Sequence, residues 1–430
     1  MPALPPRAAA RGTIGSGVLH VALPGADLLL KPKRGVPLVS LAVHCRRSVH
    51  DAPASSGLGA LGVRSAVRGA GGLDAAGLAL AFERLGGSLS PIAGSDSFGF
   101  GTAVLAEHAG DAAALLDLVF HAPAFVTGEV ARERATLADE AARVADDMLR
   151  YPIQLALRAG FGDTRYGLPA QGLPETVPTL TEEMVRRWHA AEIAAGRPAV
   201  VAVGDLEPEP FAEVLAGIFG ARRPGAALGE PAAEGWRAGG DGPVASVVPR
   251  AKRQTGLAIL FPGPSRRSGE RHAAEVWAAI ASGLGGRLFT ALRERRSLAY
   301  TVLASSWQRA GAGALLCYLA TSPEREEEAR DQLLRELARF RDEAPAALEL
   351  AQAVNYLAGQ AVVERQTAAA VAGEIAEAWL VGDGLDELAD PGARFRGVTP
   401  DAVRALAAQC LDPGRRVEGI VRGEPAGTSG

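Results

Sequence analysis

The chain is 430 residues long, with 48% hydrophobic and 22% charged residues and a formal net charge of -4. This composition is typical of a globular protein with room for more than one domain, and the lack of a long run of one charge argues against a nucleic-acid surface. No apolar run approaches the ~20 residues that a membrane-spanning helix needs.

Alternating and continuously apolar segments predict the strands of the first half of the chain. They fall at residues 18–23, 28–31, 36–45, 88–93, 95–105 and 198–204. The segment 36–45 is apolar at nearly every position, and it is therefore predicted to be a central strand.

Helical periodicity predicts the helices that accompany these strands. They fall at residues 57–72, 73–85, 111–121, 127–149, 153–160 and 209–219, and one more begins after Thr181. Ser55 or Ser56 can cap the first helix, and Thr181 can cap its own. Because runs of strands precede runs of helices, an antiparallel sheet with helices on one face is favoured over a doubly wound parallel sheet.

The middle of the chain has the composition of a linker. Residues 221–245 are rich in Gly, Pro and Ala and lack periodicity. The predicted domains are therefore residues 1–220 and 246–430, joined by residues 221–245.

The second half of the sequence repeats the first. The segment 180–208 resembles the segment 398–425, with Thr181 aligned with Thr399. A repeat at this distance indicates a duplication. We therefore predict an α+β fold of two duplicated domains, each a mostly antiparallel sheet with helices packed on one face.

Between residues 284 and 303 the periodicity changes from helical to strand-like. Leucines recur at helical spacing up to residue 295, and apolar residues then alternate at period two. The side chains of Arg293 and Tyr300 can meet across this turn, where guanidinium and phenol donors suit a peptide oxygen that gains negative charge. The alternative is structural, because the helix dipole favours a cation in a last turn and Tyr is a common strand residue.

Several strings, together with the duplication and the order of elements, resemble one family. They are GLGALGVRSAVRGAG, PAFVTGEVARERATLADEAARVADD, FGDTRYGLPAQG, VVAVGDL and GGRLFTALRERRSLAYTV. Together they resemble the pitrilysin/insulinase superfamily of metallopeptidases, which includes the mitochondrial processing peptidases. The resemblance covers nearly the whole chain and implies that the two domains form half of a clamshell chamber.

Active members of this superfamily carry the inverted zinc motif H-x-x-E-H in the first long helix. The matching positions here are Ala60, Val63 and Arg64. The first two side chains have no lone pair and a guanidinium does not deprotonate, so the resemblance implies that the zinc motif is lost. Glu140 matches the distal carboxylate ligand. Since Glu133 and Glu140 are seven residues apart, we predict that both lie on a solvated helix face.

Two other segments match only part of a zinc motif. His189 with Glu192, and His272 with Glu275, each give H-x-x-E without a second histidine, away from the position that matches the family. A histidine and a glutamate one turn apart are usually a surface pair, and this is the prediction for both.

The resemblance assigns a second signature to Arg293 and Tyr300, which match the pair that binds substrate and supports the transition state in the superfamily. A chain that keeps this pair without the zinc motif resembles the non-zinc subunit of a heterodimeric peptidase. The expected partner is a homologous subunit with H-x-x-E-H that holds the zinc. This chain itself is expected to bind no metal or cofactor and to be inactive alone.

The alternative is a non-catalytic scaffold or binding protein of the same fold, like the core proteins of respiratory complexes. The N-terminal residues lack the apolar segment of a secretory signal, which predicts a cytoplasmic location and leaves the periplasm open.

Overall fold

Two compact units make up the structure. The computed structural model describes residues 10–13, 15–48, 51–220, 233–237, 242–283 and 285–425. The first unit contains residues 1–141, 170–230 and 363–390, and the second contains residues 142–169, 231–362 and 391–430. Each unit therefore takes a segment from the other half of the sequence. Most of the predicted linker, residues 221–245, lies outside the described residues.

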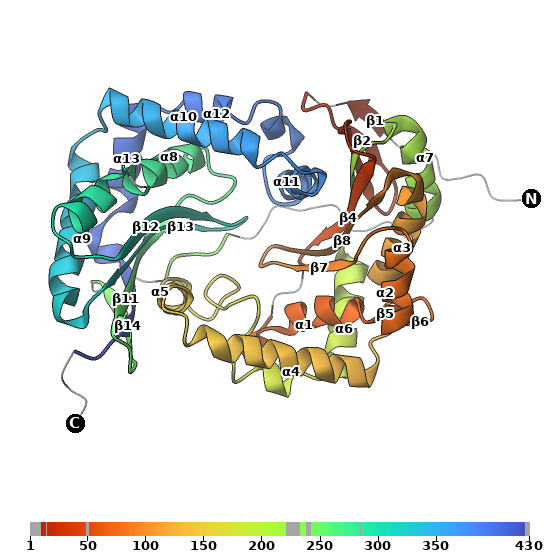
Figure 1. The fold of residues 1–430 in the computed structure, drawn as a ribbon, viewed down its shortest axis with the longest axis horizontal. Helices are drawn as coiled ribbons and strands as arrows, with labels where there is room; N and C mark the ends of the chain where they lie inside the picture. The colour runs from red at the N-terminus through yellow and green to blue at the C-terminus, as the bar shows by residue number, and fades with distance from the viewer. Residues whose placement is uncertain are drawn as a thin grey trace, which may run out of the picture. The chain divides into compact units, whose positions relative to one another are not determined.

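The first unit is built on a seven-stranded sheet (Figure 1). Its spatial order is β1 (Ala10–Thr13), β2 (Leu19–Ala22), β3 (Asp27–Pro32), β9 (Ala199–Gly204), β4 (Leu38–Arg46), β8 (Ser97–Leu105) and β7 (Ser90–Ala93). The pair β3–β9 is parallel and the other pairs are antiparallel. The strands predicted from the sequence are confirmed, and β4 lies inside the sheet as expected. The sequence did not predict β1 or the small hairpin of β5 (Gly69–Ala70) and β6 (Leu73–Asp74).

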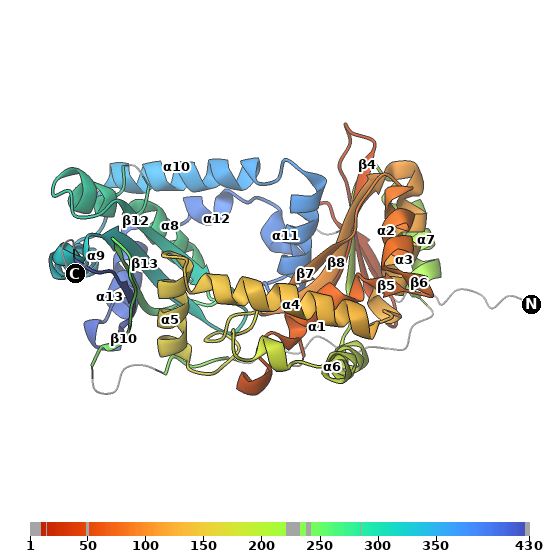
Figure 2. The same cartoon turned by 60° about the horizontal axis from the view of Figure 1, so that its bottom comes forward.

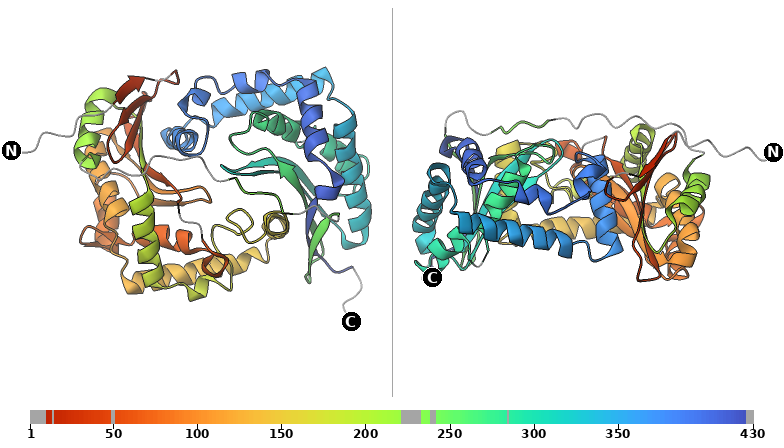
Figure 3. Two further views of the ribbon diagram at one scale, coloured as in Figure 1. Left: turned by 180° about the vertical axis from the view of Figure 1, so that it is seen from behind. Right: turned by 90° about the horizontal axis from the view of Figure 1, so that it is seen from above.

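Helices cover both faces of this sheet. Six of them are α1 (Leu58–Ala66), α2 (Ala75–Glu83), α3 (Ala109–His121), α4 (Thr127–Val144), α6 (Glu182–Ala195) and α7 (Pro208–Phe219). On the other side of β4 and β9 lies α11 (Ala368–Leu380), as Figure 2 shows, and the blue helix is seen beside the red strands from behind in Figure 3. Leu41 and Val43 belong to the main core, whereas Ala42 and His44 are buried on the face that α11 covers.

The second unit repeats this topology with five strands. Its spatial order is β10 (Val244–Pro249), β14 (Val417–Arg422), β11 (Thr255–Gly263), β13 (Gly313–Thr321) and β12 (Thr301–Gln308). The pair β10–β14 is parallel and the other pairs are antiparallel. This order matches β3-β9-β4-β8-β7, as the internal repeat predicts.

The helices of the second unit follow the same plan. They are α8 (Arg271–Ala281), a π-helix (Phe289–Glu294), α9 (Glu326–Asp342), α10 (Ala347–Val363), α12 (Ala393–Arg396) and α13 (Pro400–Cys410). From the first half of the sequence, α5 (Arg150–Phe161) contacts β11 and β14. Thr181 and Thr399 both cap their helices through side-chain oxygens, which confirms the predicted cap at Thr181. Short 3-10 helices occur at Pro53–Ser55, Ala106–His108, Val177–Thr179, Pro323–Arg325, Leu385–Leu388 and Pro413–Arg415.

The three cysteines are free and buried. Burial raises the pKa of Cys45 to about 12 and that of Cys410 to about 11, so neither is a reactive thiolate near neutral pH. None of the described helices combines the length and the apolar character that crossing a bilayer requires.

Candidate functional site

An aspartate, and neither predicted serine, caps helix α1. Gly57 has φ +96° at the N-cap position, and no side chain caps the helix from there. Instead, the Asp51 carboxylate accepts hydrogen bonds from the backbone N–H of Gly57 (3.1 Å) and of Gly59 (3.2 Å). Ser55 donates to a backbone carbonyl, and the buried Ser56 hydroxyl has no partner among the described residues. The prediction of a serine cap was therefore wrong.

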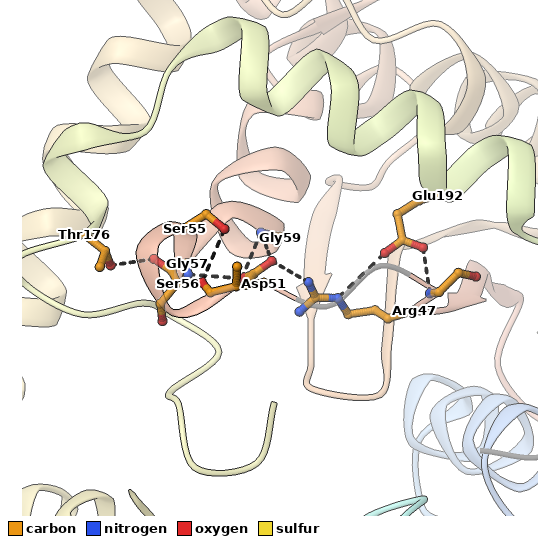
Figure 4. A network of polar contacts seen from close by, with 10 residues as sticks. Arg47, Asp51, Ser55, Ser56, Gly57, Gly59, Thr176 and Glu192 are labelled. Carbon is orange, nitrogen blue, oxygen red and sulfur yellow. Dashed lines mark hydrogen bonds and ion pairs between the residues drawn. The ribbon is translucent and has the colours of Figure 1, made fainter. Parts of the chain in front are cut away.

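Arg47 joins this cap to helix α6. Its guanidinium donates to Asp51 at 2.7 Å and lies 3.9 Å from Glu192 (Figure 4). Glu192 is fully buried and also accepts from the backbone N–H of Ser48 at 2.8 Å. A Cβ added to Gly59 would lie 2.7 Å from the Arg47 guanidinium, so this close approach needs a glycine in the first turn of α1. The network is a buried structural connection between β4, α1 and α6.

The first partial zinc motif, His189 with Glu192, lies in the interior beside this network. His189 is hydrogen-bonded to the Phe120 carbonyl at 2.9 Å, and burial lowers its pKa. Because Glu192 is held by the Arg47 network, the prediction of a surface pair was wrong here. In the second partial motif, His272 and Glu275 are half-buried and 3.8 Å apart, so that pair forms, although not on an exposed surface.

At the position where the resemblance predicts a zinc ligand, Arg64 of helix α1 contacts Glu133 and Glu140 of α4. The Arg64 guanidinium donates to both oxygens of Glu140 (2.7 and 2.9 Å) and to Glu133 (3.1 Å). Arg68, one turn later, donates to the other oxygen of Glu133 at 2.6 Å. Glu133 is only 6% exposed, so the prediction that it lies on a solvated face was wrong. The hydrogen bonds with Glu140 are the main reason why the pKa of Arg64 is raised.

These side chains do not suit a zinc ion. Ala60 and Val63 have no donor atoms, and Arg64 brings a fixed positive charge that both oxygens of Glu140 already accept. Structural and catalytic zinc sites need at least three protein ligands. Within the described ranges, no cluster of three or more His, Cys, Asp or Glu side chains is arranged to hold a metal.

A pocket of about 490 Å³ opens beside the ion pairs of Arg64 and Arg68 with Glu133. It is lined by residues of α1, α2, α4 and β7, including Arg68, Leu78 and Leu137. Pro91, on the edge strand β7, also lines it and removes one backbone donor from that edge. The pocket is therefore open, and the Arg64, Arg68 and Glu133 side chains on its wall form ion pairs with one another.

Arg293 lies in the π-helix Phe289–Glu294, which confirms the predicted helical segment but with a wider turn. Leu284, the first leucine of the predicted pattern, lies outside the described residues. The Arg293 side chain is exposed and lies 5.0 Å from the centroid of the Phe289 ring. Since π-helices are rare and are frequent at functional sites, this geometry is an independent sign of function.

Tyr300 directly precedes strand β12, and its side chain is 65% exposed. The connection from Arg293 passes through Ser297, whose φ of +49° lies in the left-handed region, where non-glycine residues are uncommon. Two backbone hydrogen bonds close the turn, from Ser297 to Arg293 (3.0 Å) and from Leu298 to Leu292 (2.7 Å). Strained backbone of this kind concentrates at active and binding sites.

The structure thus holds the backbone of the turn and leaves its two polar side chains exposed. In the described part of the chain, no hydrogen bond or ion pair joins Arg293 to Tyr300 or either side chain to a third group. Their donors are therefore available to an oxygen from outside the chain. Sequence reasoning missed the Asp51 cap and the two-sided pairing of Glu133. The spacing of Arg64 and Arg68, one turn apart, was the available signal for that pairing.

Comparison with known sequences gives a consistent result. Residues 179–357 match the family described as the Peptidase M16 inactive domain. A protein of Streptomyces coelicolor called an uncharacterized zinc protease is 28% identical over 66% of this chain and 62% of its own length. A protein of the same description from Mycobacterium bovis is 31% identical over 46% of this chain and 45% of its own length. The chain therefore spans less than two thirds of these relatives.

Solved structures share the fold. The peptidase M16 inactive domain from Pseudomonas fluorescens has a TM-score of 0.84, with 21% identity over 95% of this chain and 99% of that one. A protease from Helicobacter pylori has a TM-score of 0.83, with 16% identity over 94% of this chain and 98% of that one. A chain of Complex III2 from Candida albicans has a TM-score of 0.77, with 14% identity over 95% of this chain and 96% of that one.

Proposed function

Because the chain belongs to the pitrilysin/insulinase superfamily, with a Peptidase M16 inactive domain, we propose that it is the non-zinc subunit of a heterodimeric metallopeptidase. A homologous subunit with H-x-x-E-H is the proposed partner, and peptides or unfolded leader segments are the proposed substrates. The assembled pair, and neither chain alone, is the proposed processing peptidase.

One contrast supports this proposal. The chain fills its own metal position with Arg64, which is paired with Glu133 and Glu140. It leaves Arg293 and Tyr300 exposed, without hydrogen-bond or ion-pair partners among the described residues. A chain with no role in catalysis has no chemical need for two exposed donors at a strained turn.

In the proposed reaction, Arg293 and Tyr300 donate hydrogen bonds to the carbonyl oxygen of the scissile peptide. The backbone of the turn that carries both side chains is held by hydrogen bonds before substrate arrives, and the donated hydrogen bonds strengthen as negative charge develops on that oxygen. The H-x-x-E-H residues of the partner would hold the zinc, which would supply an activated water. The free edge of β7 or of another sheet can take up an extended peptide by strand addition.

The test is a cleavage assay with a quenched fluorescent peptide. The purified chain, the H-x-x-E-H homologue that co-purifies with it or is encoded beside it, and a mixture of the two are each assayed with and without a chelator. We expect cleavage by the mixture alone and its loss with chelator. Cleavage by this chain alone, or a mixture no faster than the homologue alone, would contradict the proposal.

A second candidate is a scaffold that uses the fold without proteolysis. The likeness to a chain of Complex III2 supports it at the level of the fold. A homodimer of this chain would carry Arg64 at both metal positions and could only bind. A stable homodimer that does not exchange with any H-x-x-E-H homologue, measured by light scattering and pull-down, favours this candidate.

A further inference from the structure

A second pocket, of about 160 Å³, lies in the first unit where the end of β3 meets helix α11. Its apolar walls include Val371 and Ile375 of α11 and Leu388 after it. Four charged residues from the two ends of the sequence also line it, namely Lys31, Lys33, Arg365 and Glu374.

The strand period explains why a lysine enters this pocket. Leu28 and Leu30 of β3 belong to the main core, so Leu29 and Lys31 lie on the opposite face, which faces α11. The Lys31 ammonium is half-buried and donates to the backbone carbonyl of Ser16. Burial and the nearby Arg365 lower the pKa of Lys31, although Glu374 opposes them.

The charges around the pocket do not balance. Arg365 donates to both oxygens of Glu374, each at 2.6 Å, and these two charges satisfy one another. In the described part of the chain, no carboxylate forms an ion pair with Lys31 or Lys33 at contact distance. Three cations against one anion leave a local charge of about +2 in a partly desolvated space.

We propose that this pocket binds a small oxyanion, a carboxylate or phosphate group, between the ammonium groups of Lys31 and Lys33. The pocket is smaller than the ~300–1,000 Å³ of typical organic ligand sites, so it takes an ion or the acidic end of a longer molecule. Lysine ammonium groups bind such anions as point charges, while the fork of Arg365 is already used by Glu374. This site is independent of the proposed peptidase role.

The test is isothermal titration of the full chain with inorganic phosphate and, separately, with acetate, in a chloride buffer of constant ionic strength. We expect saturable binding at one site, with the preferred anion identifying the group. Lys33→Met should weaken binding by roughly tenfold or more, as loss of one charge-assisted hydrogen bond implies. Melting temperature should rise with the anion in the wild type and much less in Lys33→Met, which also verifies that the variant folds.

Arg34→Met is the matched control, because it removes the same charge from the next residue outside the pocket. Arg34 is exposed and paired with Asp205 and Glu207. Its loss should change the anion affinity by less than about twofold. Absence of saturable binding for both anions, or an equal loss in Arg34→Met and Lys33→Met, would overturn the proposal.

Discussion

Arg64 brings a positive charge to the position that the resemblance matches to a metal ligand of the superfamily. Its guanidinium joins α1 to α4 through Glu133 and Glu140. Arg68 is the other partner of Glu133, so the buried carboxylate is held from two sides. A buried charge that loses a partner is strongly destabilising, whereas an exposed pair contributes little.

Arg64→Met should therefore lower the free energy of unfolding by about 1–3 kcal/mol. The range allows for Glu140, whose side chain is 44% exposed and rehydrates when the pair is broken. Urea denaturation measures the change, and Arg68→Met, at a side chain that is 49% exposed, should cost less. A denaturation midpoint unchanged in Arg64→Met would show that the pairing does not hold the two helices together.

Arg293→Ala should reduce kcat of the reconstituted peptidase by ~10²–10³-fold, as loss of an oxyanion donor does. Assembly with the partner should be unchanged, because the Arg293 side chain is exposed and no hydrogen bond or ion pair holds it in the described structure. Arg295→Ala removes another exposed cation two residues away and serves as the control. Equal rates for the wild type and Arg293→Ala would reject the role of this residue.

His44 makes stability depend on pH. Burial lowers the pKa of this histidine from 6.5 to about 4, so the folded state binds its proton less readily than the unfolded state. The unfolded chain alone is protonated between these pH values, and stability must therefore fall as the pH decreases through this range. The contribution reaches about 3 kcal/mol at pH 4.

Chemical denaturation of the wild type and of His44→Leu at several pH values between 6.5 and 4 measures this contribution. The unfolding free energy of the wild type should fall relative to that of the variant as the pH decreases, because the variant lacks the titrating group. A pH-independent difference would mean that His44 does not titrate as its burial implies.

At the scale of elements, the start of α1 shows what local sequence reasoning lacks. Serines beside a glycine-rich helix predict a cap, but Gly57 turns the backbone through φ +96°, and the carboxylate that reaches the free N–H groups comes from Asp51. The π-helix is likewise invisible to leucine spacing, because residues four apart, such as the buried Leu288 and Leu292, lie near one another in an α-helix or a π-helix. Element type was predictable from periodicity, whereas caps and turn geometry depend on contacts between separate segments.

Asp51→Ala should lower the free energy of unfolding by about 1–3 kcal/mol, since it removes the cap of α1 and a partner of Arg47. Ser56→Ala is the control, because its buried hydroxyl has no partner among the described residues. That variant should match the wild type within ~0.5 kcal/mol. Thermal or urea denaturation distinguishes the two, and equal losses would assign the cap to the serine after all.

At the scale of the whole molecule, the repeat in the sequence predicted two similar sheets, and the strand orders agree with it. The exchange of α5 and α11 between the two halves was not predictable. The nearly continuous apolar run in β4 indicates that other elements cover both of its faces, but the helix that covers the second face lies more than 300 residues away in the sequence. For the same reason, the pocket formed by Lys31 and Arg365 has no signal in any single segment.

A fragment that contains only one half of the sequence lacks a helix that covers its sheet. A fragment of residues 1–220 contains the first sheet without α11, so buried residues of β4 and β9 on that face become exposed. A fragment of residues 246–430 lacks α5, which covers β11 and β14. We expect each fragment alone to bind a hydrophobic dye and to unfold without cooperativity. Co-expression should restore a cooperative transition, because each fragment then supplies the missing helix of the other. A cooperative transition for residues 1–220 alone would show that the first sheet does not need α11, and that a contiguous first half is a domain in its own right.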